Sequence, residues 1–156
     1  MTSTIQKQTQ HDAQVFDLGI EILAHGKKSE MKAKSNLMTV MMKCHAEGGE
    51  NSLHTHATED HVFVVLQGEA TFHLGLEENE VVLHRYQGLM IPMGTYYRFQ
   101  STGDENLIQI RVGAATEENA LMDRRNVRGE WLDPMSEEDH WVTPEPIPGR
   151  FFGQES

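Results

Sequence analysis

Three of the nine histidines lie within eight residues of one another, at His54, His56 and His61. Side chains two residues apart in an extended chain point to the same face, so His54 and His56 are expected to project side by side. A short polar turn precedes His61, which can face the same way if it opens a strand that pairs with the first. Three imidazoles on one concave face would form a transition-metal site.

Two acids, Glu59 and Asp60, flank His61. The simplest interpretation of this pair is a solvated turn. Two alternatives stay open: either carboxylate could bind the metal if the loop shifts in register, or it could accept a hydrogen bond that orients an imidazole.

The residues around this cluster are organised as short strands. Runs rich in β-branched and aromatic residues are separated by turn signals between residues 36 and 112, and residues 15–23 could form an earlier strand. The lysine-rich residues 26–35 are predicted to form a loop. Short strands at regular spacing predict an all-β sandwich or barrel. With no internal repeat, we expect one barrel at residues 15–113, preceded by a flexible leader at 1–14.

The composition changes after residue 113. Residues 116–125 carry acids first and arginines last, which is typical of a short helix. Four prolines between residues 134 and 148 are expected to exclude regular secondary structure there. We therefore predict a helical or irregular C-terminal extension at residues 114–156, which packs on the barrel or on a partner subunit.

Charge and cysteine content exclude several classes of function. The formal net charge of -11 over 156 residues, with no basic cluster, argues against nucleic acid or an anionic membrane as a partner. The sequence has no apolar stretch long enough for a membrane span. The single cysteine, Cys44, excludes an internal disulfide and fits a reducing compartment. We expect a cytoplasmic protein.

The segment around the histidines resembles the first motif of the cupin superfamily. That motif reads G, five residues, H-x-H, three or four residues, E, six residues, G. Here Gly48, His54, His56 and Gly68 keep the spacing, and His61 stands where the family has its glutamate. The resemblance implies a single cupin-type barrel, also called a double-stranded β-helix or jelly roll.

A second motif of the family, G, five residues, P-x-G, two residues, H, three residues, N, is matched only at its centre. Pro92 and Gly94 fit, Tyr97 occupies the histidine position, and Ser101 occupies that of the asparagine. The resemblance implies a metal-ligand set of the three clustered histidines and Tyr97. Tyr97 binds a metal well only as phenolate, and it is equally a candidate catalytic donor that orients substrate or stabilises an oxyanion.

Two further residues are candidates for substrate binding. If Tyr97 points into the barrel, so does Phe99, two residues along the same strand. Arg111 lies in the last strand and could hold a substrate carboxylate with two hydrogen bonds if it faces the interior. A solvent-facing arginine is the alternative interpretation.

Together these features predict a metalloenzyme that acts on a small oxygen-rich or carboxylate-bearing molecule. One divalent ion of Fe, Zn, Ni, Cu or Mn is expected, since three histidines suit all of them. Oxidative cleavage, as by an oxidoreductase of the dioxygenase type, is the favoured reaction, and lyase or isomerase chemistry comes next. The alternatives are a non-enzymatic ligand-binding or sensing barrel and a metal-free isomerase or epimerase. The resemblance also implies a homodimer.

Overall fold

Twelve β-strands and no helix form the regular structure of residues 12–46, 51–118 and 123–154, which are the residues that this computed structural model describes. None of these residues belongs to a helix that could cross a membrane. The strands are β1 (Ile20–His25), β2 (Lys27–Lys34), β3 (Met38–His45), β4 (His54–His56), β5 (Glu59–Gln67), β6 (Ala70–Leu74), β7 (Asn79–Leu83), β8 (Gly88–Ile91), β9 (Tyr97–Ser101), β10 (Leu107–Ala115), β11 (Arg124–Asn126) and β12 (Glu145–Phe152).

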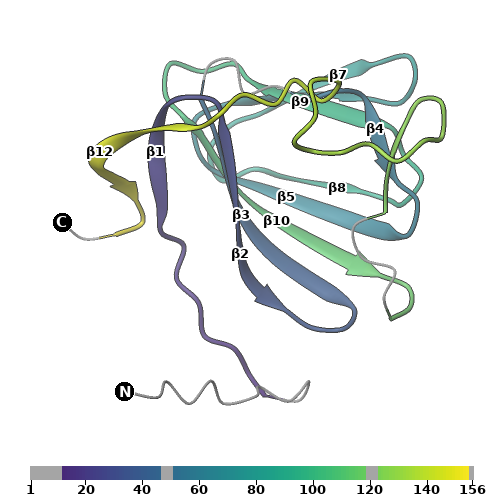
Figure 1. The fold of residues 1–156 in the computed structure, drawn as a ribbon, viewed down its shortest axis with the longest axis horizontal. Helices are drawn as coiled ribbons and strands as arrows, with labels where there is room; N and C mark the ends of the chain where they lie inside the picture. The colour runs from purple at the N-terminus through teal and green to yellow at the C-terminus, as the bar shows by residue number, and fades with distance from the viewer. Residues whose placement is uncertain (1–11, 47–50, 119–122, 155–156) are drawn as a thin grey trace.

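Two five-stranded antiparallel sheets face each other (Figure 1). The first sheet has the order β2-β3-β10-β5-β8 and the second has the order β11-β4-β9-β6-β7. Some strands that are consecutive in sequence, such as β4 and β5, lie in different sheets. This arrangement confirms the predicted all-β barrel.

The interior between the two sheets is aromatic at its centre. Phe63 of the first sheet contacts Phe72 and Phe99 of the second, with ring centroids 5.1 and 5.5 Å apart. All three rings are fully buried. Such pairs contribute about 0.5–1.5 kcal/mol each beyond the burial of apolar area, so they hold the sheets together next to the histidines.

A second apolar cluster lies on the outer face of the first sheet. Ile20 and Leu23 of β1 pack there against Met42, Cys44 and Ile108. Alternate residues of β3 and β10 face this cluster, so the residues between them face the barrel interior. Burial raises the pKa of the Cys44 thiol to about 12, which makes it a poor nucleophile.

The prediction of a loop at residues 26–35 was wrong, because Lys27–Lys34 forms strand β2. Its polar composition has a physical reason: β2 is the edge strand of its sheet, and its inward residues Lys27 and Ser29 line a cavity instead of an apolar core. The early strand begins at Ile20, later than predicted.

The prediction of a helix at residues 116–125 was also wrong for the part that the structure describes. Residues 116–118 are not helical, and Arg124–Asn126 forms β11, which pairs with β4. Residues 119–122 lie outside the described residues, as do the glycine at position 48 and residues 1–11. Gln14, at the end of the predicted leader, exchanges hydrogen bonds with the backbone of Lys34.

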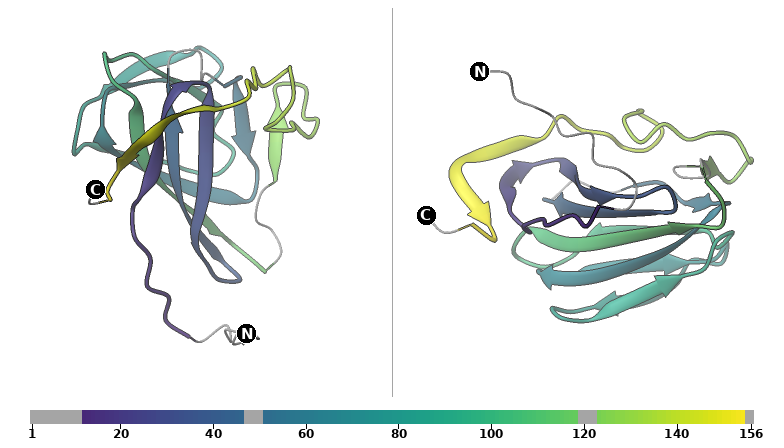
Figure 2. Two further views of the ribbon diagram at one scale, coloured as in Figure 1. Left: turned by 60° about the vertical axis from the view of Figure 1, so that its left-hand side comes forward. Right: turned by 90° about the horizontal axis from the view of Figure 1, so that it is seen from below.

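The prolines do not exclude regular structure near the C-terminus. Strand β12 contains Pro146 and Pro148 and pairs with β1 in a separate two-stranded sheet, with shifts in register. Proline is tolerated on an edge strand because its missing N–H removes no hydrogen bond from a central ladder. The segment that leads to β12 crosses one end of the barrel (Figure 2).

Candidate metal centre

Three buried side chains from both sheets meet inside the barrel. His56 comes from β4, and Glu59 and His61 come from β5 in the facing sheet. Glu59 and His61 are two residues apart in a strand and therefore share its inner face. The potential ligand atoms of the three residues lie within 4.8 Å of one another, and each side chain is at most 4% exposed.

The separations within this cluster suit a common ion. Glu59 Oε2 lies 3.8 Å from His56 Nδ1, and Glu59 Oε1 lies 3.6 Å from His61 Nε2. Ligands at the usual distance of about 2.1 Å from a tetrahedral ion are about 3.4 Å apart. Each of these two pairs is therefore within a few tenths of an ångström of the spacing between ligands of one ion.

The imidazole nitrogens that face Glu59 have no hydrogen-bond partner among the described residues. These are His56 Nδ1 and His61 Nε2. The other nitrogen of His61, Nδ1, lies 3.1 Å from the hydroxyl oxygen of Tyr97. When Nδ1 carries the proton and donates it to Tyr97, the Nε2 lone pair is directed at the cluster. A bound metal would explain buried nitrogens that lack a hydrogen bond.

Burial keeps the imidazoles neutral. It lowers the pKa of His56 far below the usual value, and the neighbouring His61 and His54 lower it further. Burial also lowers the pKa of His61, although Glu59 opposes this effect. A neutral imidazole keeps the lone pair that metal binding requires, so the residues fit a divalent transition metal.

The Glu59 carboxylate occupies the space that a side chain at position 113 would fill, and this position is a glycine. Gly113 of β10 pairs with His61, and a Cβ atom built on it would lie 2.6 Å from Glu59 Oε1 and 3.0 Å from Thr39 Oγ1. Any other residue at position 113 would have to displace Glu59.

The structure places the predicted ligands His54 and Tyr97 beside this group. The His54 ring is 5.2 Å from that of His56 and 4.5 Å from that of Tyr97, and its Nδ1 lies 2.7 Å from the Ser52 carbonyl oxygen. Burial raises the pKa of Tyr97, which favours the neutral phenol. His54 is not part of the group of atoms that lie within 4.8 Å of one another. Tyr97 contacts this group through its hydroxyl oxygen, 3.1 Å from His61 Nδ1.

The two acids that flank His61 have different environments. Glu59 is buried within the cluster, whereas Asp60 is exposed and accepts a hydrogen bond from the Met93 backbone N–H at 2.8 Å. The alternation of β5 explains the difference, since Glu59 and His61 point inward and Asp60 points outward. His56 meets Glu59 and His61 across the barrel and not along hydrogen-bonded neighbouring strands, because β4 pairs with β9 and β11 and not with β5.

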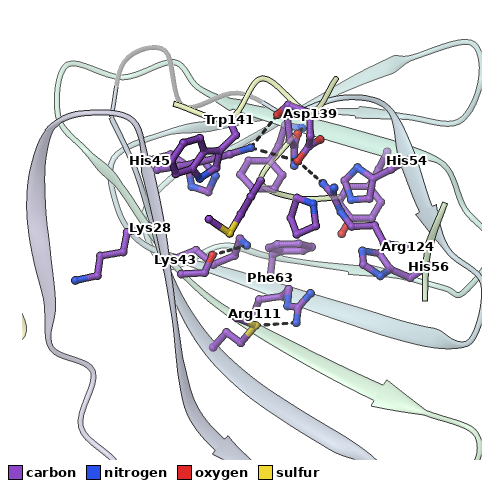
Figure 3. Close-up of a pocket in the computed structure, with 18 of the residues that line it drawn as sticks. Lys28, Lys43, His45, His54, His56, Phe63, Arg111, Arg124, Asp139 and Trp141 are labelled. Carbon is purple, nitrogen blue, oxygen red and sulfur yellow. Dashed lines mark hydrogen bonds and ion pairs between the residues drawn. The ribbon is translucent and has the colours of Figure 1, made fainter. Parts of the chain in front are cut away.

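A cavity of about 360 Å³ adjoins the cluster. His54, His56 and Tyr97 line it, together with both predicted substrate-binding residues, Phe99 and Arg111. Arg111 is 5% exposed and donates a hydrogen bond to Met41 Sδ, so it faces the interior and not solvent. Figure 3 shows His54 and His56 on one side of this cavity, with Phe63 near its centre.

The cavity is cationic although the chain as a whole is acidic. Asp139 is the one carboxylate among the described residues that line it, and five basic residues do so: Lys27, Lys28, Lys43, Arg111 and Arg124. Asp139 comes from the C-terminal segment, is 1% exposed, and lies 2.9 Å from Arg124 and 3.3 Å from Lys27. These ion pairs fix the segment over the cavity, and the remaining positive charge favours an anionic ligand.

Sequence reasoning did not identify Lys43, His45, Arg124 or Asp139 as residues of the site. A signal for the first two exists in β3, where the inward Lys43 and His45 alternate with the outward Met42 and Cys44. No local signal marks Arg124 and Asp139, because their positions depend on how the C-terminal segment returns to the barrel.

Comparison with known proteins gives the same architecture. Residues 41–112 match the family model described as the cupin domain. The fold resembles a conserved Klebsiella pneumoniae protein with a double-stranded beta-helix domain, at 19% identity and a TM-score of 0.57, over 64% of this chain and 81% of that one. No match was found among curated proteins.

Two further solved structures are similar at the level of the fold. The cupin domain of Schizosaccharomyces pombe Cnp3 is 17% identical with a TM-score of 0.54, over 57% of this chain and 64% of that one. KdgF from Halomonas sp. is 16% identical with a TM-score of 0.53, over 59% of this chain and 82% of that one. At these identities the likeness establishes a shared fold and nothing finer.

Proposed function

The chain belongs to the cupin superfamily, and on that basis we propose that it is a metal-dependent enzyme whose ion is held by His56, Glu59 and His61. Its substrate is a small carboxylate-bearing molecule in the adjoining cavity. The observation that carries this proposal is the buried cluster itself, in which two neutral imidazoles and one carboxylate face one another beside a cationic cavity.

The ligand set favours oxidative cleavage. Two histidines and one carboxylate are the protein ligands of many non-haem Fe(II) oxygenases, and the same set with water also suits Zn(II). When bound, such an ion supplies Lewis acidity and, if it is redox-active, activation of O₂. Glu59 adds the negative charge that a set of neutral histidines lacks.

The chain's own residues have separate roles in this proposal. Arg111 binds the substrate carboxylate through its guanidinium. Phe63 and Phe99 line the cavity with apolar surface and exclude water from the reacting molecule. The Tyr97 hydroxyl oxygen accepts a hydrogen bond from His61 Nδ1–H, so the Nε2 lone pair would be directed at a bound ion.

The first experiment measures metal content by inductively coupled plasma mass spectrometry on tag-free protein. The variant Glu59→Gln removes the charge with little change in shape, and Asp60→Asn is its matched control on the outer face of the same strand. We expect about one transition-metal ion per wild-type and Asp60→Asn chain. Metal affinity in Glu59→Gln should fall by about 100-fold or more, since the loss of outer-sphere partners alone costs 10–100-fold.

The reaction class is tested on protein reconstituted with Fe(II), with an oxygen electrode and a panel of small mono- and dicarboxylates. Consumption of O₂ that depends on one of these acids, and that is lost in Glu59→Gln, supports oxidative cleavage. Absence of metal from the wild type after reconstitution with each candidate ion would refute the metalloenzyme and leave a ligand-binding barrel.

A further inference from the structure

A second polar cluster lies on the interior face of the first sheet, away from the candidate metal centre. Lys43 and His45 are two residues apart on β3, and Gln109 of β10 is paired directly with Lys43. Directly paired residues share a face, and their Cβ atoms are about 5 Å apart. In Figure 3, Lys43 and His45 lie on the opposite side of the cavity from His54 and His56.

Three buried polar atoms of this cluster, on His45 and Gln109, have no hydrogen-bond partner among the described residues. Gln109 is 0% exposed, and neither its Oε1 nor its Nε2 makes a hydrogen bond. His45 is 2% exposed, lines the cavity, and has no partner for Nδ1. A buried polar group left unpaired destabilises the fold, so packing alone gives no reason for a glutamine at this position.

Lys43 makes no ion pair with an acid among the described residues. Its Nζ donates a hydrogen bond to Ser29 Oγ at 2.9 Å and makes no ion pair. The cavity's carboxylate, Asp139, is already paired with Lys27 and Arg124. Burial lowers the pKa of Lys43 well below its usual value, and the charges of Arg111, Arg124 and Lys27 lower it further, although the charge of Asp139 opposes them. An anion beside Lys43 would reverse this effect.

We propose that Lys43, His45 and Gln109 form an anion subsite that binds a carboxylate at the end of the ligand remote from the metal. The ligand is therefore an elongated organic acid, with this carboxylate at one end and a second oxygen-bearing group at the other. This subsite rests on the proposed function in one respect only, which is that the other end of the ligand faces the metal.

The spacing of residues along β3 agrees with an elongated ligand. Lys43 is four residues along β3 from Thr39, which lies beside Gly113 and His61. Four residues of strand span about 13 Å, and the inward side chains shorten the gap between the two polar ends. Phe63 lies between these ends, so the middle of the ligand meets apolar surface.

The test measures binding of succinate, glutarate and adipate, with acetate as the short probe, by isothermal titration calorimetry on EDTA-treated protein. Lys43→Met and Gln109→Leu remove the proposed contacts. Lys32→Met is the matched control, because Lys32 lies on the same sheet but is paired with Glu30 at 3.1 Å and does not line the cavity.

We expect one of the three dicarboxylates to bind more tightly than acetate. Lys43→Met and Gln109→Leu should each weaken that binding about 10-fold, as loss of one charged or buried hydrogen bond does. Lys32→Met should stay within about 2-fold of the wild type.

A second readout separates ligand binding from a structural role. If the Gln109 amide is unpaired, Gln109→Leu should raise the thermal midpoint of the ligand-free protein by about 2–4 °C while it weakens binding. A lowered midpoint would show a structural partner for the amide and overturn the proposal. Failure of all three dicarboxylates to bind would also overturn it. If the wild type binds no metal but still binds a dicarboxylate, the proposed function is refuted and this subsite is supported.

Discussion

Acidification should strongly destabilise the metal-free protein, because three buried imidazoles resist protonation in the folded state. Burial lowers the pKa of His45, His54 and His56 far below the usual value. In the unfolded chain the same residues titrate near pH 6.5. Below about pH 6.5 the unfolded state therefore binds more protons than the folded state, and the free energy of unfolding falls as the pH falls.

The size of the effect follows from these shifts. Between about pH 7 and about pH 5, each imidazole that stays neutral in the folded protein lowers the free energy of unfolding by about 2 kcal/mol. Three such residues give about 6 kcal/mol, an upper value because water that enters the cavity would solvate a protonated ring. The stability of a typical domain is about 5–15 kcal/mol, so the loss would unfold a marginal protein.

Urea unfolding of EDTA-treated protein at several pH values between about 7 and 5 measures this dependence. His45→Gln is the informative variant, because His45 is not part of the candidate metal cluster, and it should remove about one third of the pH dependence. A wild type that loses less than about 2 kcal/mol over this range would refute the reasoning, as would an unchanged slope in His45→Gln.

Two further substitutions probe the metal centre without removing a ligand. Gly113→Ala places a methyl group 2.6 Å from Glu59 Oε1, so it should lower stability by about 1–3 kcal/mol and metal affinity by 10-fold or more, as urea unfolding and metal titration would show. Unchanged metal affinity in this variant would mean that Glu59 is not a ligand. Tyr97→Phe removes the hydroxyl 3.1 Å from His61 Nδ1 and should weaken metal binding about 10-fold in competition titrations with a chelator. A loss much larger than about 100-fold would instead indicate that Tyr97 binds the ion directly.

The position of Glu59 on the same face as His61 was already contained in the sequence. The rule that placed His54 and His56 on one face applies equally to Glu59 and His61, which are also two residues apart. The interpretation of Glu59 and Asp60 as a turn conceals this relation, because β5 begins at Glu59. The strand start was the missing information, and strand ends are weakly marked by local composition.

Other errors had a common physical cause. Strand β2 was predicted to be a loop because it is polar, and the prolines of β12 were predicted to prevent a strand. Both are edge strands, and β2 lines a cationic cavity. Hydrophobic pattern predicts strands that face an apolar core, so it fails where a strand faces a ligand site or pairs on one side only.

The sequence by itself determined the all-β class, the strands between residues 36 and 112, and the candidate histidines, because these depend on alternation and spacing within a few residues. Only the tertiary structure decided that His56 from one sheet meets Glu59 and His61 from the other, and that Asp139 pairs with Arg124 over the cavity. Contacts of this kind depend on how whole sheets and the C-terminal segment pack, and no local pattern encodes which distant side chains they bring together.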